Sequence, residues 1–234
     1  MIVGMEMTTS EDPEKWTLSD VVALAALRPL VEGYVPWTTW SMGPAAIVSI
    51  VNEIELKRRS TVVELGAGAS TLYLARAVAN VGGRLVSVEQ DPDLAVYLRR
   101  LVDREGLSDV ASVEQVGLLP LPPAYRVDSA AWSSPDTWYD VDRLRAVCPE
   151  GIDVLVVDAP PAGNQDRVLA REPAVNVLCG QFAAEYAIFL DDTDRPAERE
   201  TLRRWGDRLG IDTQIIERIS LGLGRSDGGM IPSL

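Results

Sequence analysis

Short apolar segments alternate with amphipathic segments along most of this chain. From residue 61 onward, runs of Val, Ile and Leu recur, and those in the middle are apolar at nearly every position, as strands covered on both faces must be. They predict strands at 61–65, 84–89, 110–115, 152–158, 186–191 and 211–220. The helical spacing of apolar residues between them predicts helices at 70–81, 92–106, 138–147, 165–183 and 195–210.

This alternation favours right-handed crossovers and an α/β fold, in which an open, mostly parallel sheet carries helices on both faces. Ligands of such sheets bind at the carboxyl ends of the strands. Two further helices, at 17–34 and 45–59, precede the first strand and are separated by the segment PWTTWSMGP. The Pro- and Ser-rich residues 118–138 are expected to form a long loop, and loops of this length are often functional.

Composition narrows the class of protein. With 234 residues, 47% of them hydrophobic, the chain can bury one sizeable core. Its start is acidic, unlike a secretory leader, and no apolar run approaches the roughly 18 residues that span a bilayer, so we expect a soluble, cytoplasmic protein without membrane contact. The formal charge of −13 disfavours nucleic acid as a partner. The chain has no histidine, which leaves proton transfer and metal binding to carboxylates, Tyr, Lys, Cys or water.

The residues V-V-E-L-G-A-G-A-S-T (62–71) carry the strongest chemical signal in the sequence. They join the first predicted strand to a helix, and Gly66 and Gly68 let the backbone turn sharply and let a ligand approach the amides there. A dinucleotide site would carry glycine where Thr71 stands. Glu64 would repel a pyrophosphate but suits the cationic amino-acid end of S-adenosylmethionine (SAM). The alternative is an ordinary tight turn.

The string E-L-G-A-G resembles the first motif, E/D-x-G-x-G, of class I SAM-dependent methyltransferases. The resemblance implies a Rossmann-like, three-layer αβα sandwich around a mostly parallel, seven-stranded sheet. Residues 1–59 would then be an amino-terminal helical or lid segment, and residues 60–234 the methyltransferase domain. The residues that the resemblance assigns to the methionine part of SAM are Glu64, Gly66, Ala67, Gly68, Ser70 and Thr71.

Residues at the next strand ends extend this cofactor site. Glu89 ends the second strand about twenty residues after the turn, where an acid accepts hydrogen bonds from both ribose hydroxyls; a solvated strand end is the alternative. Gln90 follows it, and Asp158 ends the fourth strand beside the expected position of the methyl group. The third strand lacks the family's frequent Gly-Asp, which leaves Gln115 as the candidate for contact with adenine.

Three aspartates follow two strands that we expect to be neighbours: Asp158 after the fourth, and Asp191 and Asp192 after the fifth. Three carboxylates so close repel one another unless a cation lies between them. The pattern resembles that of catechol O-methyltransferases, and the resemblance implies that these three aspartates hold Mg²⁺ or Mn²⁺, for which an all-oxygen site is suited. The alternative is that the acids after the fifth strand cap the helix that starts near Arg195.

The sequence also departs from the catechol enzymes. Their lysine base, three residues beyond the strand-four aspartate, is replaced by Pro161. Asp166 or Asp158 is then expected to accept the proton, although Asp166 is also suited to cap a helix. Arg167 and Arg195 can neutralise the aspartates without a metal, clamp a carboxylate of the substrate, or simply lie on the surface.

Aromatic residues flank the expected site in two segments. Trp37 and Trp40 precede the core, where related enzymes carry a lid, and Trp138 and Tyr139 follow the long loop. They can form the walls of a dry substrate pocket or belong to the core. We therefore expect a SAM-dependent O-methyltransferase that acts, with a divalent metal, on a hydroxyl of a small molecule such as a sugar or natural-product intermediate. The alternatives are a metal-independent N- or O-methyltransferase and a nucleotide-binding Rossmann domain without chemistry; the oligomeric state stays open, with a homodimer as one option.

Overall fold

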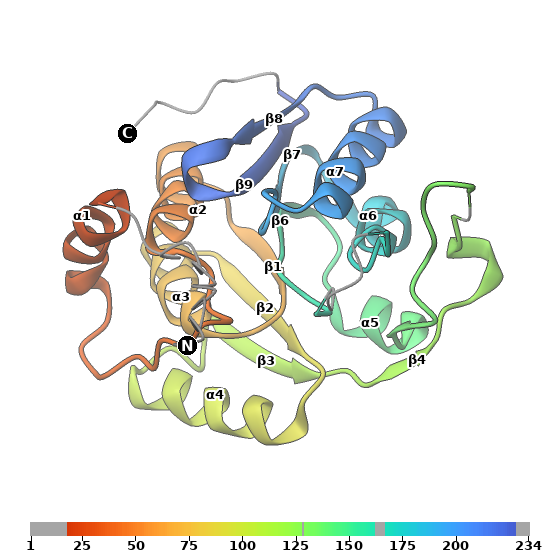
Figure 1. Ribbon diagram of the computed structural model, residues 1–234. Helices are drawn as coiled ribbons and strands as arrows, with labels where there is room; N and C mark the ends of the chain where they lie inside the picture. The colour runs from red at the N-terminus through yellow and green to blue at the C-terminus, as the bar shows by residue number, and fades with distance from the viewer. Residues whose placement is uncertain (1–17, 128, 162–166, 228–234) are drawn as a thin grey trace, which may run out of the picture.

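A computed structural model describes residues 18–127, 129–161 and 167–227 of the chain. Seven strands form one sheet in the order β3-β2-β1-β6-β7-β9-β8 (Figure 1). The five strands β3, β2, β1, β6 and β7 run parallel, whereas β9 is antiparallel to both of its neighbours. The strands are β1 (Thr61–Leu65), β2 (Arg84–Glu89), β3 (Ala111–Gln115), β6 (Ile152–Val157), β7 (Phe182–Leu190), β8 (Thr213–Ile216) and β9 (Leu221–Arg225). The predicted mostly parallel sheet is confirmed.

Helices cover both faces of this sheet, so the molecule has three layers (Figure 1). One face carries α2 (Pro44–Lys57), α3 (Ala69–Val81) and α4 (Pro92–Arg104), with α1 (Leu18–Leu27) packed outside against α2. The other face carries α5 (Val141–Val147), α6 (Pro173–Leu178) and α7 (Pro196–Leu209). Short 3-10 turns lie at Arg28–Leu30, Pro123–Tyr125, Cys179–Gln181 and Glu217–Ile219.

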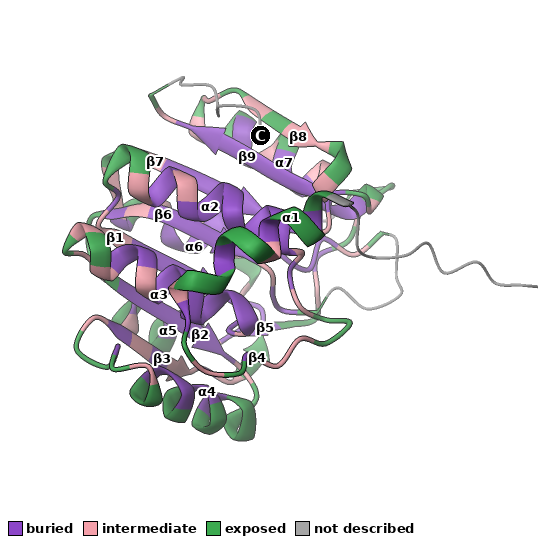
Figure 2. Cartoon of the chain, turned by 90° about the vertical axis from the view of Figure 1, so that its left-hand side faces the viewer, coloured by how far each residue is buried: buried purple, intermediate pink, exposed green. Residues whose placement is uncertain are grey.

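Strand geometry explains why the central strands are apolar at nearly every position. Successive side chains of a strand point to opposite faces. Val62 and Phe189 accordingly pack in the core under α2 to α4, while their chain neighbours Val63 and Leu190 pack in the core under α5 to α7. Figure 2 shows the resulting buried sheet between helices whose outer faces are exposed.

The carboxyl-terminal strands differ from the prediction. The single strand expected at 211–220 ends at Ile216, and Glu217–Ile219 form a 3-10 turn. The last strand of the sheet is β9, whose LGLGR sequence gave too little apolar signal to be predicted. Its glycines have a packing role, because a Cβ at Gly222 would lie 2.7 Å from a methyl group of Leu202 in α7.

Several other predicted boundaries were also wrong. The expected long loop contains a ribbon of β4 (Leu118–Pro120) paired antiparallel with β5 (Thr137–Tyr139), so the helix predicted from residue 138 begins at Val141. The helix predicted at 165–183 is, within its described part, only α6 and a 3-10 turn, because Pro173 fixes a late helix start. Strand β7 begins at Phe182, earlier than expected.

Polar contacts fasten the amino-terminal segment to the rest of the molecule. The Asp20 carboxylate accepts the Ala45 N–H at 3.0 Å and thereby caps α2. The Glu105 carboxylate accepts the N–H groups of Glu32 and Gly33 at 2.8 and 3.0 Å. These contacts fix the two ends of the connection between α1 and α2, whose middle borders the pocket described below. Within the described part of the chain, none of the helices combines the length and the apolar character that crossing a bilayer requires.

Candidate active site

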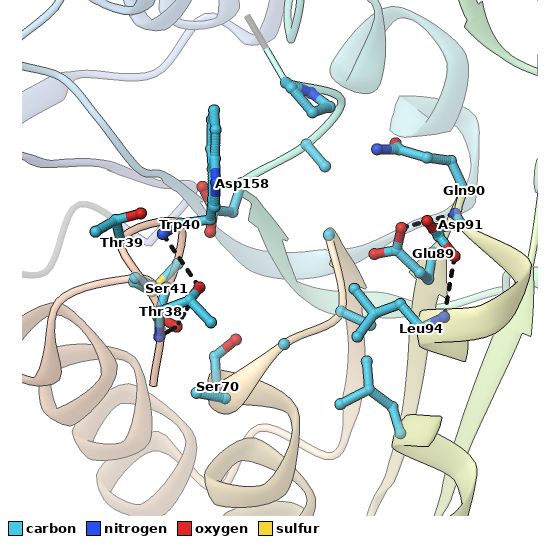
Figure 3. Close-up of a pocket in the computed structure, with 18 of the residues that line it drawn as sticks. Thr38, Thr39, Trp40, Ser41, Ser70, Glu89, Gln90, Asp91, Leu94 and Asp158 are labelled. Carbon is cyan, nitrogen blue, oxygen red and sulfur yellow. Dashed lines mark hydrogen bonds between the residues drawn. The ribbon is translucent and has the colours of Figure 1, made fainter. Parts of the chain in front are cut away.

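A pocket of about 430 Å³ opens above the carboxyl ends of β1, β2 and β6. Four parts of the chain line it: the connection before α2, the turn after β1, the end of β2 with the start of α4, and the ends of β6 and β7 (Figure 3). The predicted site residues among its lining are Trp40, Gly66, Ala67, Gly68, Ser70, Glu89, Gln90, Asp158, Asp192 and Arg195. These predicted residues therefore gather around one pocket at the carboxyl ends of the strands, and their roles stay predictions.

The two glycines of the turn differ in why they are needed. Gly66 has a φ of +102°, and a Cβ there would lie 2.8 Å from the Cβ of Ala159. The fold itself therefore requires glycine at this position. Gly68 has an extended φ of −168°, and a Cβ there would meet nothing within 4 Å among the described atoms. At Gly68 the missing side chain only leaves the pocket open.

Glu64 lies beneath the turn and is fully buried. Its carboxylate accepts the hydroxyls of Ser70 at 2.5 Å and Thr71 at 2.6 Å, and also that of Ser87. Burial raises the pKa of Glu64, and these hydrogen bonds oppose the rise. Neither Glu64 nor Thr71 is among the lining residues of the pocket, so the contact predicted between Glu64 and the ammonium of SAM stays a prediction.

Glu89 ends β2 on the opposite wall of the pocket, where Figure 3 shows it beside Asp91. Its side chain is 4% exposed and accepts the Asp91 N–H at 2.8 Å. Burial raises the pKa of Glu89, while backbone hydrogen bonds oppose this. Gln115 donates from Nε2 to the Gln90 carbonyl at 3.2 Å and is not among the described lining residues; its contact with adenine stays a prediction.

The three predicted metal ligands do come together. Asp158 follows β6, Asp191 and Asp192 follow β7, and each offers an oxygen within 4.8 Å of the others. Burial, and then the nearby Asp191, raises the pKa of Asp158 well above its usual range. Asp192 has a φ of +59°, a conformation that costs energy in a residue other than glycine. The helix-capping alternative is not observed in the described residues, because Arg195 is the N-cap of α7 and makes no side-chain cap hydrogen bond.

A buried arginine that the sequence analysis missed lies against these carboxylates. Arg171, 2% exposed, donates from one Nη to Asp158 at 3.1 Å and to Asp192 at 2.9 Å. Its other Nη donates to the Asp191 carbonyl at 2.9 Å. Arg195 adds a second ion pair to Asp192 at 3.0 Å. Of the two arginines predicted to neutralise the cluster, Arg195 therefore does so, while the exposed Arg167 does not line the pocket.

Glu198, on the first turn of α7, lies on the other side of Arg171. The distance from its Oε1 to the Arg171 Nε is 3.8 Å, too long for a hydrogen bond. Both Glu198 carboxylate oxygens and the Arg171 Nε are buried without a hydrogen-bond partner in the described structure. Burial raises the pKa of Glu198 to about 7, and Arg171 opposes the rise.

The four predicted aromatic residues divide into two groups. Trp40 is 75% exposed and lines the pocket (Figure 3), while Trp37 packs on Tyr73 with ring centroids 6.0 Å apart. Trp138 and Tyr139 are 0% and 1% exposed, lie in the core under α5 to α7, and are not among the described lining residues. For these two the structure shows the core arrangement that the sequence left open.

Some residues of the site escaped sequence analysis for identifiable reasons. Arg171 falls within the helix predicted at 165–183, one helical turn after Arg167. That pattern did not mark it as a site residue. Glu198 lies in the charge-rich sequence RPAERE, where one buried acid has no distinguishing pattern. Asp166, the predicted base, lies outside the described residues.

Comparison with known proteins assigns the chain to a family. A scan against models of protein families gave no match. A catechol O-methyltransferase of Niastella koreensis is 30% identical over 205 residues, which span 84% of this chain and 81% of that relative. A catechol O-methyltransferase of Mycobacterium tuberculosis is 30% identical over 170 residues, 68% of this chain and 65% of that relative.

The chain belongs to the catechol O-methyltransferase family. Solved structures agree on the fold of this family member. An SAH-bound methyltransferase of Podospora anserina matches with a TM-score of 0.56 at 13% identity, over 96% of this chain and 97% of the other. An O-methyltransferase of Bacillus cereus in complex with SAH matches with a TM-score of 0.56 at 16% identity, over 88% and 89%.

Membership of this family confirms several of the predictions made from the sequence. The enzyme is a class I SAM-dependent methyltransferase, as predicted, with a Rossmann-like fold. SAM is its methyl donor. The alternative of a nucleotide-binding domain without chemistry is therefore set aside.

Proposed function

We propose that the enzyme transfers the methyl group of SAM to one hydroxyl of a small-molecule vicinal diol of the catechol type, assisted by a divalent cation. The observation that carries this proposal is the meeting of Asp158, Asp191 and Asp192 within 4.8 Å, beside the pocket that the glycine turn and Glu89 also border. The names of the two relatives support the catechol type. A diol can offer two adjacent oxygens to one cation, which a simple alcohol cannot.

The residues of the turn and of β2 fit SAM. The open space beside Gly68 suits a ligand that lies against the backbone, and Glu89 offers a buried carboxylate to two ribose hydroxyls. Ser70 lines the pocket while its hydroxyl donates to Glu64, so we propose that Ser70 contacts the amino-acid end and that Glu64 acts on it from beneath the turn, through Ser70. When bound, SAM supplies an electrophilic methyl group.

The donor set fits a hard divalent cation such as Mg²⁺ or Mn²⁺, since it consists of carboxylate oxygens alone. The charges agree with this. Asp158, Asp191, Asp192 and Glu198 carry four negative charges when ionised, and Arg171 and Arg195 return two positive ones. A deficit of two charges remains, which a divalent ion would balance. When bound, such an ion favours the ionised form of the acceptor hydroxyl.

The remaining roles fall to residues around the pocket. We propose that the segment 36–42 covers the reactants, with Trp40 as an aromatic wall that excludes water. The proton of the acceptor passes to Asp158 or Asp166, because Pro161 lines the pocket where catechol enzymes have lysine. Arg195 orients Asp192 through their ion pair.

The test is methyl transfer from SAM to 3,4-dihydroxybenzoate, compared with its analogue in which one hydroxyl is already methylated. We expect turnover with the diol only, a loss of about 100-fold or more in EDTA, since such an ion stabilises charge by several kcal/mol, and recovery on addition of Mg²⁺. Asp192→Asn should lose turnover to a similar degree. The matched control is Asp194→Asn, because Asp194 is exposed and outside the pocket.

A second candidate is metal-independent N- or O-methyl transfer. The observation that favours it is Arg171, a resident cation already bonded to Asp158 and Asp192. Turnover that persists in EDTA would support this candidate and overturn the metal-assisted proposal. Turnover with neither a diol nor an amine of similar size would overturn the proposed acceptor class.

A further inference from the structure

Arg171 occupies an unusual position between two sets of carboxylates. One Nη is shared by Asp158 and Asp192 at 3.1 and 2.9 Å, and both of these acids are proposed ligands of the divalent cation. Arg171 is 2% exposed and lies at the wall of the pocket. A buried arginine satisfies its fixed fork of N–H groups best by bidentate pairing. Arg171 instead spreads its bonds over two side chains and a backbone carbonyl.

Glu198 is a second potential partner of the same guanidinium, although it makes no hydrogen bond to it. Its carboxylate is 0% exposed, both oxygens lack a hydrogen-bond partner in the described structure, and so does the Arg171 Nε that faces it. Their separation of 3.8 Å exceeds a charge-assisted hydrogen bond of about 2.8 Å by only about 1 Å. A purely structural ion pair would not be expected to leave the Arg171 Nε and both Glu198 oxygens without hydrogen bonds in the protein interior.

We propose that Arg171 is an internal counter-cation that exchanges with the divalent ion: it holds Asp158 and Asp192 in the metal-free enzyme and turns to Glu198 when the ion takes them. Arg171 is thus a positioning residue, and Glu198 is its second partner. The inference rests on the proposed metal site. It accounts for the guanidinium placed against acids that lie within 4.8 Å of one another, and for the buried glutamate 3.8 Å from its Nε.

The exchange predicts opposite effects for the two residues. Without Arg171, the ion competes only with Arg195, at Asp192, and binds more tightly. Without the negative charge of Glu198, Arg171 stays on the aspartates and the ion binds more weakly. Because Glu198 acts through Arg171, its effect should vanish once Arg171 is replaced. If Glu198 merely contributed negative charge to the site, replacing it would weaken ion binding equally in the presence and in the absence of Arg171.

The test is Mn²⁺ binding by calorimetry and electron paramagnetic resonance, on the full chain at pH 8, where Glu198 is ionised. The four proteins are wild type, Arg171→Gln, Glu198→Gln and the double variant. We expect Arg171→Gln to bind Mn²⁺ about tenfold more tightly and Glu198→Gln about tenfold more weakly, within the range usual for coupled sites. The double variant should match Arg171→Gln within about threefold.

Two further variants guard against misfolding of Arg171→Gln and against failure of the metal site itself. If Arg171→Gln does not fold, Arg171→Lys replaces it: an ammonium lacks the planar fork whose two Nη atoms reach the carboxylates and the Asp191 carbonyl separately, so it should hold the aspartates less well and Mn²⁺ affinity should still rise. Asp192→Asn separates the two proposals. The exchange is wrong if Mn²⁺ binding needs Asp192 but is unchanged or weakened in a folded Arg171 variant. It is also wrong if Glu198→Gln weakens Mn²⁺ binding equally in the wild type and in the Arg171 variant. If Mn²⁺ binding ignores Asp192, or occurs in none of the folded proteins, the metal site itself is wrong and the exchange falls with it.

Discussion

At the scale of single residues, Gly66 is required by the fold, whereas Gly68 leaves room for a ligand. Gly66→Ala places a Cβ at 2.8 Å from Ala159 in a left-handed conformation. We expect it to lower the free energy of unfolding by about 1–3 kcal/mol, as measured by urea denaturation, and to weaken SAH binding by distorting the turn.

Gly68→Ala is the matched variant, because its Cβ has room and its φ is extended. Its free energy of unfolding should stay within about 1 kcal/mol of the wild type, since only the preference of the helix N-cap changes. Calorimetry should nevertheless show SAH binding weakened by about tenfold or more, because the methyl group enters the space of a ligand. Unchanged SAH affinity in Gly68→Ala would contradict a cofactor lying against this turn.

How far single residues could be predicted depended on where the strands end. Glu89, Asp158 and Asp192 were predictable because parallel strands bring their carboxyl ends to one edge. Arg171 was not, because its segment was predicted as one long helix that the structure replaces by a short one starting at Pro173, and its partners belong to other elements. The burial of Glu64 beneath three hydroxyls likewise depends on β2, which supplies Ser87.

At the scale of elements, the connection between α1 and α2 gives Val31, Val35 and Met42 to the core and also borders the pocket. It is fastened at both ends by Asp20 and Glu105. Between these contacts Trp40 stays 75% exposed although it lines the pocket. An aromatic side chain left in solvent beside a site has little stabilising role in the free protein, which points to a contact with a reactant.

Trp40→Ala should therefore raise the KM for the acceptor about tenfold, the loss typical of an apolar contact of about 1.4 kcal/mol. The free energy of unfolding should change by less than about 0.5 kcal/mol. Tyr34→Ala is the matched control, since Tyr34 is 78% exposed in the same connection and does not line the pocket. Equal effects of both variants on KM would show that the connection acts as a whole and Trp40 has no specific role.

Elements were predictable where apolar periodicity was strong and failed where it was weak. The five parallel strands and α2 to α4 followed from their patterns. β9 was missed because Gly222 and Gly224 replace the apolar side chains that would have marked it, yet Gly222 admits Leu202 of α7 close to the sheet. The ribbon of β4 and β5 was missed because three-residue strands with a proline leave almost no period to detect.

At the scale of the whole molecule, buried acids set the response to pH. Burial raises the pKa of Glu64, Glu89, Glu172 and Glu198, to about 7 for Glu198. The folded chain then holds these protons more tightly than the unfolded chain does. The stability that these groups contribute is therefore fully present below about pH 4.5. It is lost as the pH rises from there through their raised pKa values.

Three other acids, held by hydrogen bonds or ion pairs, oppose this trend at the acid end. Hydrogen bonds from the backbone of Glu32 and Gly33 lower the pKa of Glu105, and arginine partners lower the pKa of Glu200 and Glu217. The stability that these groups contribute is present above their unfolded values and is lost below them. Together the two sets predict a stability maximum near pH 5, reached before the net charge grows more negative and self-repulsion increases.

The absence of histidine makes this prediction unusually direct. No side chain with its ordinary pKa titrates between pH 5.5 and 7.5, so a change in stability there reports shifted carboxyls. Urea denaturation in EDTA and without SAM should show the free energy of unfolding falling across this range, by at most about 1.4 kcal/mol per pH unit for each proton. Glu198→Gln should flatten the fall near pH 7, whereas Glu217→Gln, on the surface, should leave it unchanged. A curve that is level or rises from pH 5 to 7.5 would mean that the buried carboxyls are solvated in the folded enzyme.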